Sequence, residues 1–454
     1  MRRRVVIPLV AALAVTVGAA FVVVDRVGSD SGKPAVVATP SPTRPPVLAA
    51  LGSSAVPPTK AQVRRAFAPA LAALPAGEQI GGLVVDVAAG TTLWSHEAGT
   101  PVAPASTLKI LTAAAALHAL GPDFHFTTTV RLLGNTIYLV GGGDPTLALS
   151  SSVHATPVAY PAPATLADLA KQAAASLQPP AQSFRLRVDA SLWSTATLAK
   201  GWNAGYVAEG DITPPSALEL DGGRLQPGEL DSPRTNNPAT QTADAFTELL
   251  RKDGITIHGT VRNAATPSTA SPVAQVSSPP LAALVQRMLT ASDNDLAEAL
   301  GRAVAMHDGQ PPTFAGEVAA LRSELGDLGV PANALSLQDA SGLSHDDAVA
   351  PTALVGVLRA AVRDPALRPL LEGLPVAGFT GTLADRYRGD HKSAGTGQVR
   401  AKTGSLVGVN ALAGVVADGS GRLLAFALLG FGTVETDAVQ TGLDQLASGL
   451  AALD

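Results

Sequence analysis

The stretch PASTLKILTAAAALHAL, residues 104–120, is the one that decides how the rest of the chain is interpreted. Ser106 and Lys109 are three residues apart, so on a helix they share one face and the amine can reach the hydroxyl. A lysine can take the hydroxyl proton only when it is neutral, a form that burial or a nearby cation favours by lowering its pKa. Pro104 suits the first helical position, which leaves Ser106 in the first turn, where unpaired backbone N–H groups can receive an oxyanion. This predicts a serine nucleophile with a lysine base, although a helix cap beside a solvated lysine fits the same letters.

Two further short motifs occur once each. Residues 292–294 are the only Ser-x-Asn in the chain, and residues 402–404 are the only Lys-Thr-Gly. Alone, the first fits a helix N-cap and the second an exposed turn. Apolar strand residues follow Lys402, however, so an unpaired charge there would be costly to bury. By composition, all three motifs in this order are expected in roughly a few sequences per thousand.

Composition excludes several classes of protein. The chain has 454 residues, which suggests roughly three structural units, and 46% of them are hydrophobic, enough for well-formed cores. The net charge is -5 and the only basic run is at residues 2–4, so a nucleic-acid partner is not expected. Without cysteine there is no disulfide, thiolate zinc site or cysteine nucleophile.

The amino terminus predicts export. Three arginines at 2–4 precede an uncharged run of 20 residues at 5–24, long enough to cross a bilayer as a helix. A cleaved signal peptide fits equally well, because Gly18 and Ala20 are small residues at a signal peptidase's spacing. We therefore expect a signal peptide or an anchor in the cytoplasmic membrane at 1–26, a Pro/Ser/Ala-rich linker at 27–60, and an extracytoplasmic location downstream.

The hydrophobic pattern predicts an α/β protein of the α+β kind, in which helices cover an antiparallel sheet. The catalytic region is expected at 61–120 and 275–454, and an α+β insert domain at 121–274. Outside the insert we expect a helix at 61–74, a hairpin at 82–87 and 91–97, two long apolar strands at 399–417 and 422–432, and a final helix at 435–453. In the insert we expect strands at 127–133, 136–140, 184–188 and 255–262 and helices at 165–177 and 240–252.

The three motifs resemble those of penicillin-binding proteins and serine β-lactamases. The 186 positions from Ser106 to Ser292 exceed the β-lactamase interval, and the long insert resembles the D-alanyl-D-alanine carboxypeptidase/endopeptidase family, the low-molecular-mass class C penicillin-binding proteins (peptidase family S13). The resemblance runs from about Gln62 to Asp454. It includes VGGGDPTL at 140–147, ASDNDLAEAL at 291–300, QDASGLSHDD at 338–347, GFTGTLADR at 378–386 and VRAKTGSLVGVNALAG at 399–414.

The resemblance implies a penicillin-binding fold and acyl transfer at a D-alanyl-D-alanine bond of peptidoglycan stem peptides, with β-lactam antibiotics as covalent inhibitors. It implies that Ser106 attacks, that Lys109 takes its proton, and that Ser292 and Lys402 relay a proton to the leaving D-alanine. It implies that Asn294 binds a substrate amide and that Thr403, Gly404 and Ser405 bind the substrate, with the two hydroxyls on its terminal carboxylate. It also implies that the backbone N–H groups of Ser106 and Ser405 form the oxyanion hole.

Two further substrate-binding residues are assigned from the same resemblance. Asp144 corresponds to the family's acidic residue beside the substrate's side-chain amine, and His345 stands where the family usually has a basic residue, most often arginine. An Asp-Pro turn for Asp144 and a loop histidine before a helix for His345 fit the letters at least as well.

Other enzyme classes that cleave peptides or β-lactams would require different sequence motifs. A class A β-lactamase needs a Glu-x-x-Leu-Asn stretch, a Ser-His-Asp hydrolase a Gly-x-Ser-x-Gly elbow, and a zinc peptidase a His-Glu-x-x-His helix, and the chain contains none of them. The triple glycine at 141–143 lacks the Gly-Lys ending of a phosphate loop. We expect no cofactor and no metal. A β-lactamase and a catalytically silent peptidoglycan-binding protein are the alternatives.

Overall fold

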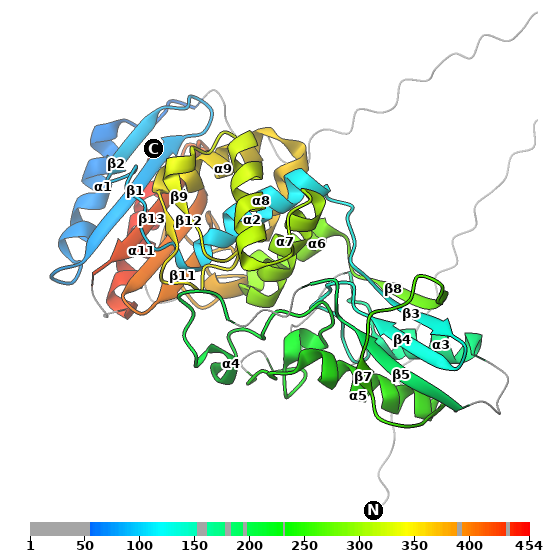
Figure 1. The fold of residues 1–454 in the computed structure, drawn as a ribbon. Helices are drawn as coiled ribbons and strands as arrows, with labels where there is room; N and C mark the ends of the chain where they lie inside the picture. The colour runs from blue at the N-terminus through cyan, green and yellow to red at the C-terminus, as the bar shows by residue number, and fades with distance from the viewer. Residues whose placement is uncertain are drawn as a thin grey trace, which may run out of the picture. The chain divides into compact units, whose positions relative to one another are not determined.

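The computed structural model describes residues 55–151, 161–177, 183–193, 198–229, 232–387, 393–432 and 436–454 (Figure 1). The predicted signal peptide or anchor at 1–26 lies outside the described residues, as does most of the predicted linker. Within the described ranges, every helix is too short or too polar to span a bilayer.

The first strand of the described chain pairs with a strand from its last part. Helix α1 (Lys60–Ala72) begins at Thr59, whose hydroxyl accepts a hydrogen bond from the backbone N–H of Gln62 in a capping box. The expected hairpin is present as strands β1 (Gln79–Asp86) and β2 (Thr92–His96). Strand β1 also pairs along its length with β13 (Leu423–Phe431), from the last part of the chain.

The main sheet has five strands in the order β11-β12-β13-β1-β2, and every neighbouring pair is antiparallel. Strands β11 (Val399–Leu406) and β12 (Val409–Ala417) come from residues 399–417, which the sequence predicted as one strand. That prediction was wrong because Gly408 turns the chain with a φ of +73°, in the left-handed region that glycine adopts without penalty. The edge strand β11 carries the Lys-Thr-Gly motif.

Helices cover both faces of this sheet, as expected. Helices α1 and α11 (Thr436–Ala451) pack on one face, and α9 (Pro351–Arg363) packs on the other. Along β13, Phe426 and Leu428 belong to one core, whereas Ala425 and Ala427 belong to the other. The strand is therefore apolar at every position, because alternate side chains enter two different cores.

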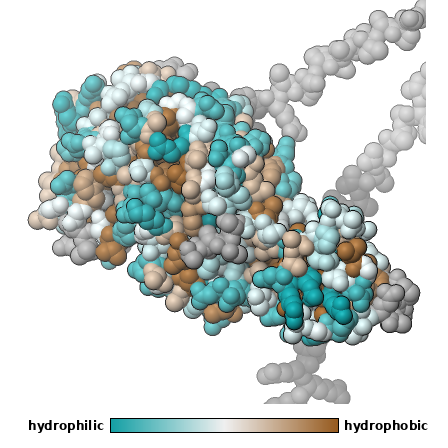
Figure 2. Space-filling view, viewed as in Figure 1, coloured by the Kyte–Doolittle hydropathy of each residue, from teal (hydrophilic) through white to brown (hydrophobic). Residues whose placement is uncertain are grey.

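Helix α2 (Lys109–Leu120) is the centre of the helical layer. It is buried from Lys109 to Leu117, and its small alanines allow several helices to pack closely around it. On the face drawn in Figure 2, hydrophobic residues are scattered among hydrophilic ones. Helix α2 contacts α9 and four further helices, α6 (Leu281–Ala291), α7 (Asn294–His307), α8 (Phe314–Asp327) and α10 (Arg368–Gly373). Between α8 and α9, the short strands β9 (Leu335–Ser336) and β10 (Ala348–Val349) pair with each other.

A second sheet is built from residues between α2 and α6. Its order is β6-β5-β4-β3-β8, with β7 also pairing with β5. The residues predicted as one strand at 255–262 form two short strands instead, because Gly259 between them has a φ of +76°. The strands and helices between α2 and α6 are β3 (Thr127–Leu133), β4 (Thr136–Val140), α3 (Leu166–Ser176), β5 (Ser183–Asp189), α4 (Tyr206–Glu209), α5 (Pro238–Lys252), β6 (Thr256–Ile257), β7 (Arg262–Asn263) and β8 (Ser271–Ser277).

Candidate active site

Ser106 lies in a tight turn in front of the central helix. The sequence predicted an α-helix from Pro104, but residues Ala105–Leu108 form the 3-10 helix η1, and α2 begins only at Lys109. Ala105 has a φ of +46°, and its carbonyl oxygen lies so near Gly342 that a Cβ there would be 2.0 Å away. Side chains three residues apart eclipse in a 3-10 helix, so Ser106 and Lys109 still share one face.

Lys109 makes three hydrogen bonds. Its Nζ lies 2.9 Å from Ser106 Oγ, 2.6 Å from Asn294 Oδ1 and 2.6 Å from the carbonyl oxygen of Ser341. The last two atoms can only accept, whereas the Ser106 hydroxyl also carries a proton. When the amine is neutral, its lone pair therefore has one proton to receive, that of Ser106.

The surroundings of Lys109 favour this neutral form. The side chain is fully buried, and burial lowers its pKa from 10.5 to about 8, although the negative charges of Asp339 and Glu298 oppose the shift. At neutral pH an amine with a pKa near 8 is a more effective proton acceptor than an exposed lysine, because a much larger fraction of it is unprotonated.

The Ser-Asp-Asn motif forms the turn between α6 and α7. Ser292 ends α6 with a φ of +57°, and Asp293 caps α7 by accepting a hydrogen bond from the backbone N–H of Leu296. Asn294 Oδ1 accepts from Lys109, and Asn294 Nδ2 donates to the carbonyl oxygen of Asp211 at 2.8 Å. Because Lys109 can only donate and that carbonyl can only accept, the orientation of the amide is fixed.

Lys402 was expected at the start of a buried strand; it is buried, but it lies inside β11, three residues after the strand begins. Its side chain is fully buried and its Nζ donates to the carbonyl oxygen of Thr403 at 2.8 Å. Burial lowers the pKa of Lys402 well below its ordinary value, and the positive charges of Lys109 and Arg386 lower it further. Two buried amines therefore disfavour a charge on one another.

The rest of the Lys-Thr-Gly strand is held by hydroxyl contacts. Thr403 Oγ1 lies 2.7 Å from Thr382 Oγ1, and Gln440 Nε2 donates to Ser405 Oγ at 3.0 Å. At Gly404, a Cβ would lie 3.0 Å from the backbone nitrogen of Ser106 and 2.8 Å from a neighbouring carbonyl oxygen. Glycine thus allows β11 to approach the nucleophile turn closely.

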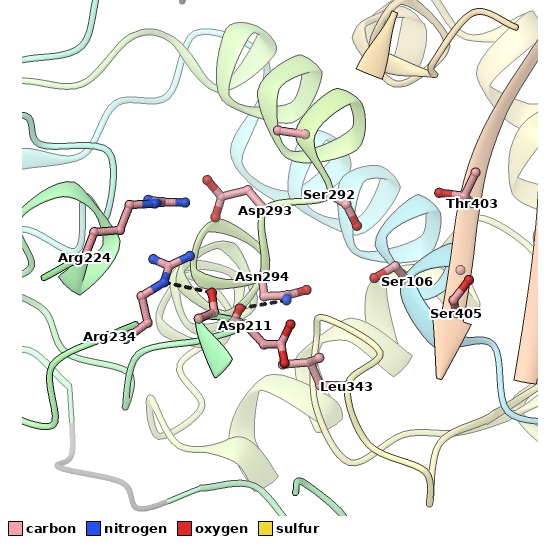
Figure 3. A pocket seen from close by; sticks show the side chains of 13 residues that line it. Ser106, Asp211, Arg224, Arg234, Ser292, Asp293, Asn294, Leu343, Thr403 and Ser405 are labelled. Carbon is pink, nitrogen blue, oxygen red and sulfur yellow. Dashed lines mark hydrogen bonds between the residues drawn. The ribbon is translucent and has the colours of Figure 1, made fainter. Parts of the chain in front are cut away.

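One cavity of about 350 Å³ joins the three motifs. Figure 3 shows Ser106 between Ser292, Asn294 and the strand that carries Thr403 and Ser405. The opposite part of the cavity carries Arg224 and Arg234, which the sequence analysis missed because no local pattern marks them. The lining residues are Ser106, Gly210, Asp211, Arg224, Arg234, Ala291, Ser292, Asp293, Asn294, Leu343, Thr403, Gly404 and Ser405.

Asp144 and His345 do not line this cavity. Asp144 is buried, and its Oδ1 accepts hydrogen bonds from the backbone N–H and the hydroxyl of Thr146, as in an Asp-Pro turn. His345 is exposed on the loop that follows Leu343. Their roles in substrate binding therefore stay predictions. Among the described residues, no group of three or more acidic and histidine side chains could hold a metal ion.

Comparisons with known proteins show which sequences and folds the chain resembles. The model of the D-Ala-D-Ala carboxypeptidase 3 (S13) family matches residues 63–233 and 231–453. The chain is 38% identical to carboxypeptidase DacB of Mycolicibacterium smegmatis over 97% of this chain and 95% of that protein. It is 28% identical to the D-alanyl-D-alanine carboxypeptidase of Actinomadura over 78% of each. Its fold is similar to that of penicillin binding protein 4 from Haemophilus influenzae, with a TM-score of 0.70 at 23% identity over 85% of this chain and 98% of that one.

Proposed function

Because the chain belongs to the D-Ala-D-Ala carboxypeptidase 3 (S13) family, we propose that it is a serine D-alanyl-D-alanine carboxypeptidase acting on peptidoglycan stem peptides through an acyl-enzyme. The observation that carries this proposal is the 2.9 Å contact between the buried Lys109 Nζ and the Oγ of Ser106, a residue that lines the same cavity as the other two motifs. Nucleophilic catalysis by serine requires a base beside the hydroxyl, and a buried neutral amine can be that base.

Acylation begins with neutral Lys109. As Ser106 Oγ attacks the carbonyl carbon of the penultimate D-alanine, its proton passes to the lone pair of Lys109 Nζ. Negative charge develops on the carbonyl oxygen, where the backbone N–H groups of Ser106 and Ser405 stabilise it. The C–N bond then breaks, and the proton that Lys109 received passes through Ser292 and Lys402 to the leaving D-alanine nitrogen, which returns Lys109 to its neutral form.

Hydrolysis completes the cycle. A water molecule attacks the ester carbon, loses its proton to Lys109 and releases the shortened peptide, while Ser106 Oγ regains a proton. A β-lactam forms the same ester but its leaving group stays attached to the acyl part. We therefore propose that β-lactam antibiotics inhibit the enzyme as long-lived covalent adducts.

Binding of the substrate carboxylate is assigned to β11. The hydroxyls of Thr403 and Ser405 donate to it near Lys402, and the negative charge of the substrate raises the pKa of that lysine and favours its protonated form. The edge position of β11 lets the peptide backbone align as an added strand, and Asn294 binds a substrate amide. Asp144 and His345 are proposed to contact the peptide's side chains farther along.

The site of action follows from the substrate. Peptidoglycan lies outside the cytoplasmic membrane, so we propose an extracytoplasmic enzyme whose residues 1–26 are a signal peptide or an anchor in that membrane. We also propose that the catalytic region comprises residues 61–120 and 275–454 and that residues 121–274 form the insert domain.

Release of D-alanine from an acyl-D-alanyl-D-alanine peptide tests the proposed function. We expect release by the wild-type protein and none above background by Ser106→Ala. A cross-linked dimer of stem peptides, offered in parallel, measures endopeptidase activity. Absence of release by the folded wild-type protein would contradict the assignment, and rapid turnover of penicillin without peptide cleavage would favour a β-lactamase.

A further inference from the structure

The turn that carries Ser292 and Asn294 is held from the segment between β5 and α5. Three hydrogen bonds reach it. Asp295 Oδ1 accepts from the backbone N–H of Thr213 at 2.8 Å, Asp295 Oδ2 accepts from Arg234 Nη1 at 3.1 Å, and Asn294 Nδ2 donates to Asp211 at 2.8 Å. Asp295 and Arg234 are nearly inaccessible to solvent, so their ion pair is little screened.

Arg234 is itself fixed on its far side. Its Nε donates to the carbonyl oxygen of Gly210 at 2.9 Å, and its Nη1 also donates to the carbonyl oxygen of Gly222 (Figure 3 shows the first of these bonds). The hydroxyl of Thr213 donates to the Gly222 carbonyl as well, at 2.6 Å. The planar guanidinium thus ties two loops to one carboxylate, which the point charge of a lysine cannot do in the same geometry.

The glycines behind Arg234 are needed for this arrangement. Gly222 has a φ of +56° and Gly223 a φ of +67°, and a Cβ at Gly223 would lie 2.2 Å from Thr213 Oγ1. Only glycine fits a left-handed turn with so close a neighbour. The loop is therefore built to present the Gly222 carbonyl to Arg234 and Thr213.

The turn that receives these bonds is strained. Ser292 has a left-handed φ of +57° without being glycine, a conformation that persists only when its surroundings hold it. Asn294, two residues on, contacts the base Lys109 at 2.6 Å. A small displacement of the turn would move both the proposed proton relay and a partner of the base.

We propose that Arg234 is a positioning residue for acylation: by its ion pair with Asp295 it holds Ser292 and Asn294 at their working distance from Ser106 and Lys109. The proposal rests on the proposed function. It adds that the segment between β5 and α5, which contains none of the three motifs, positions the Ser-Asp-Asn turn. Because a misplacement of about 1 Å costs roughly a hundredfold in rate, loss of this ion pair lowers the rate by roughly tenfold to a hundredfold.

The test compares full-length variants by benzylpenicillin acylation and by kcat and KM for D-alanine release. Arg234→Met keeps much of the volume but removes the fork, and Asp295→Asn keeps the shape but removes the charge. We expect each to lower the acylation rate constant and kcat by roughly tenfold to a hundredfold with little change in KM, and the double variant to lose no more than either alone, since both act through one contact.

A matched control separates positioning from general stability. Arg422→Met breaks another buried ion pair, in which Arg422 Nε lies 2.6 Å from Asp86 Oδ2, away from the cavity lining. We expect it to lower Tm while the acylation rate stays at the wild-type value. Arg234→Lys keeps the charge without the fork and should recover only part of the rate.

Several results would overturn the proposal. These are wild-type rates in folded Arg234→Met or Asp295→Asn, a loss in Arg422→Met as large as in Arg234→Met, a rise in KM alone, or additive losses in the double variant. If Arg234→Met fails to fold, the isosteric Asp295→Asn decides. Absence of acylation in the wild-type protein itself would instead refute the proposed function, so the two failures are distinguishable.

Discussion

The pKa of Lys109 sets a quantitative expectation for the pH dependence of acylation. With a pKa of about 8, about 9% of the amine is neutral at pH 7, half at pH 8 and about 90% at pH 9. An ordinary lysine with a pKa of 10.5 would be neutral in only about 0.03% of molecules at pH 7. Because only the neutral amine can accept the Ser106 proton, the acylation rate should rise about tenfold between pH 7 and pH 9 and then level off.

The measurement is the second-order rate constant for acylation by a chromogenic cephalosporin from pH 6 to pH 10 at constant ionic strength. Tm is followed over the same range, so that unfolding is not mistaken for titration. The groups whose charges act on Lys109 in the folded state are Asp293, Asp295, Glu298, Asp339 and Lys402. A rate that is constant from pH 6 to pH 9, or that rises only towards pH 10.5, would refute Lys109 as the base.

Three further predictions concern single residues. Asp339→Asn removes the negative charge that most opposes the lowered pKa of Lys109, so the rising limb should move below pH 8; a shift to higher pH in the same rate assay would contradict this. Gly342→Ala places a Cβ where the Ala105 carbonyl stands 2.0 Å away and should slow acylation roughly a hundredfold in a folded protein, with an unchanged rate as the contrary result. His345→Ala should raise KM for D-alanine release from a stem peptide about fivefold at constant kcat, the effect of one hydrogen bond of about 1 kcal/mol, and an unchanged KM would remove His345 from the substrate site.

Short-range patterns predicted much of the fold and the start of the site. The hairpin of β1 and β2 follows from two short strand-forming runs on either side of a turn that contains glycine, and the contact between Ser106 and Lys109 follows from a spacing of three. The burial of Lys402 followed from the apolar residues after it, because a strand with both faces covered has no polar side. Each of these rests on residues within one or two elements.

Strand breaks were missed where glycine overrides an apolar run. Gly259 and Gly408 both have positive φ, and each divides what the sequence predicted as one strand. Both glycines are visible in the sequence, but Gly404 and Gly414 lie inside strands of the same apolar run, so a glycine alone does not mark a break. Strand β8 (Ser271–Ser277) was not predicted because no position in it is fully buried, so no alternation of apolar residues marks it.

Long-range contacts of the site could not be predicted from one sequence. Arg234 and Asp295 are 61 residues apart, and Trp202 donates its Nε1–H to Asp339 across 137 residues. Asp339 also accepts from three backbone N–H groups of the loop that contacts Lys109. No local periodicity records such pairs, since they depend on how separate elements pack.

An intact-mass time course of the full-length protein with benzylpenicillin, beside Ser106→Ala, tests the central claim most directly. The account predicts one adduct with the mass of one benzylpenicillin on the wild-type protein, located on Ser106 by peptide mapping, and none on Ser106→Ala. An adduct that persists supports the peptidase, whereas one that disappears quickly while penicillin is consumed contradicts it in favour of a β-lactamase. No adduct on the folded wild-type protein, or an equal adduct on Ser106→Ala, would contradict Ser106 as the nucleophile.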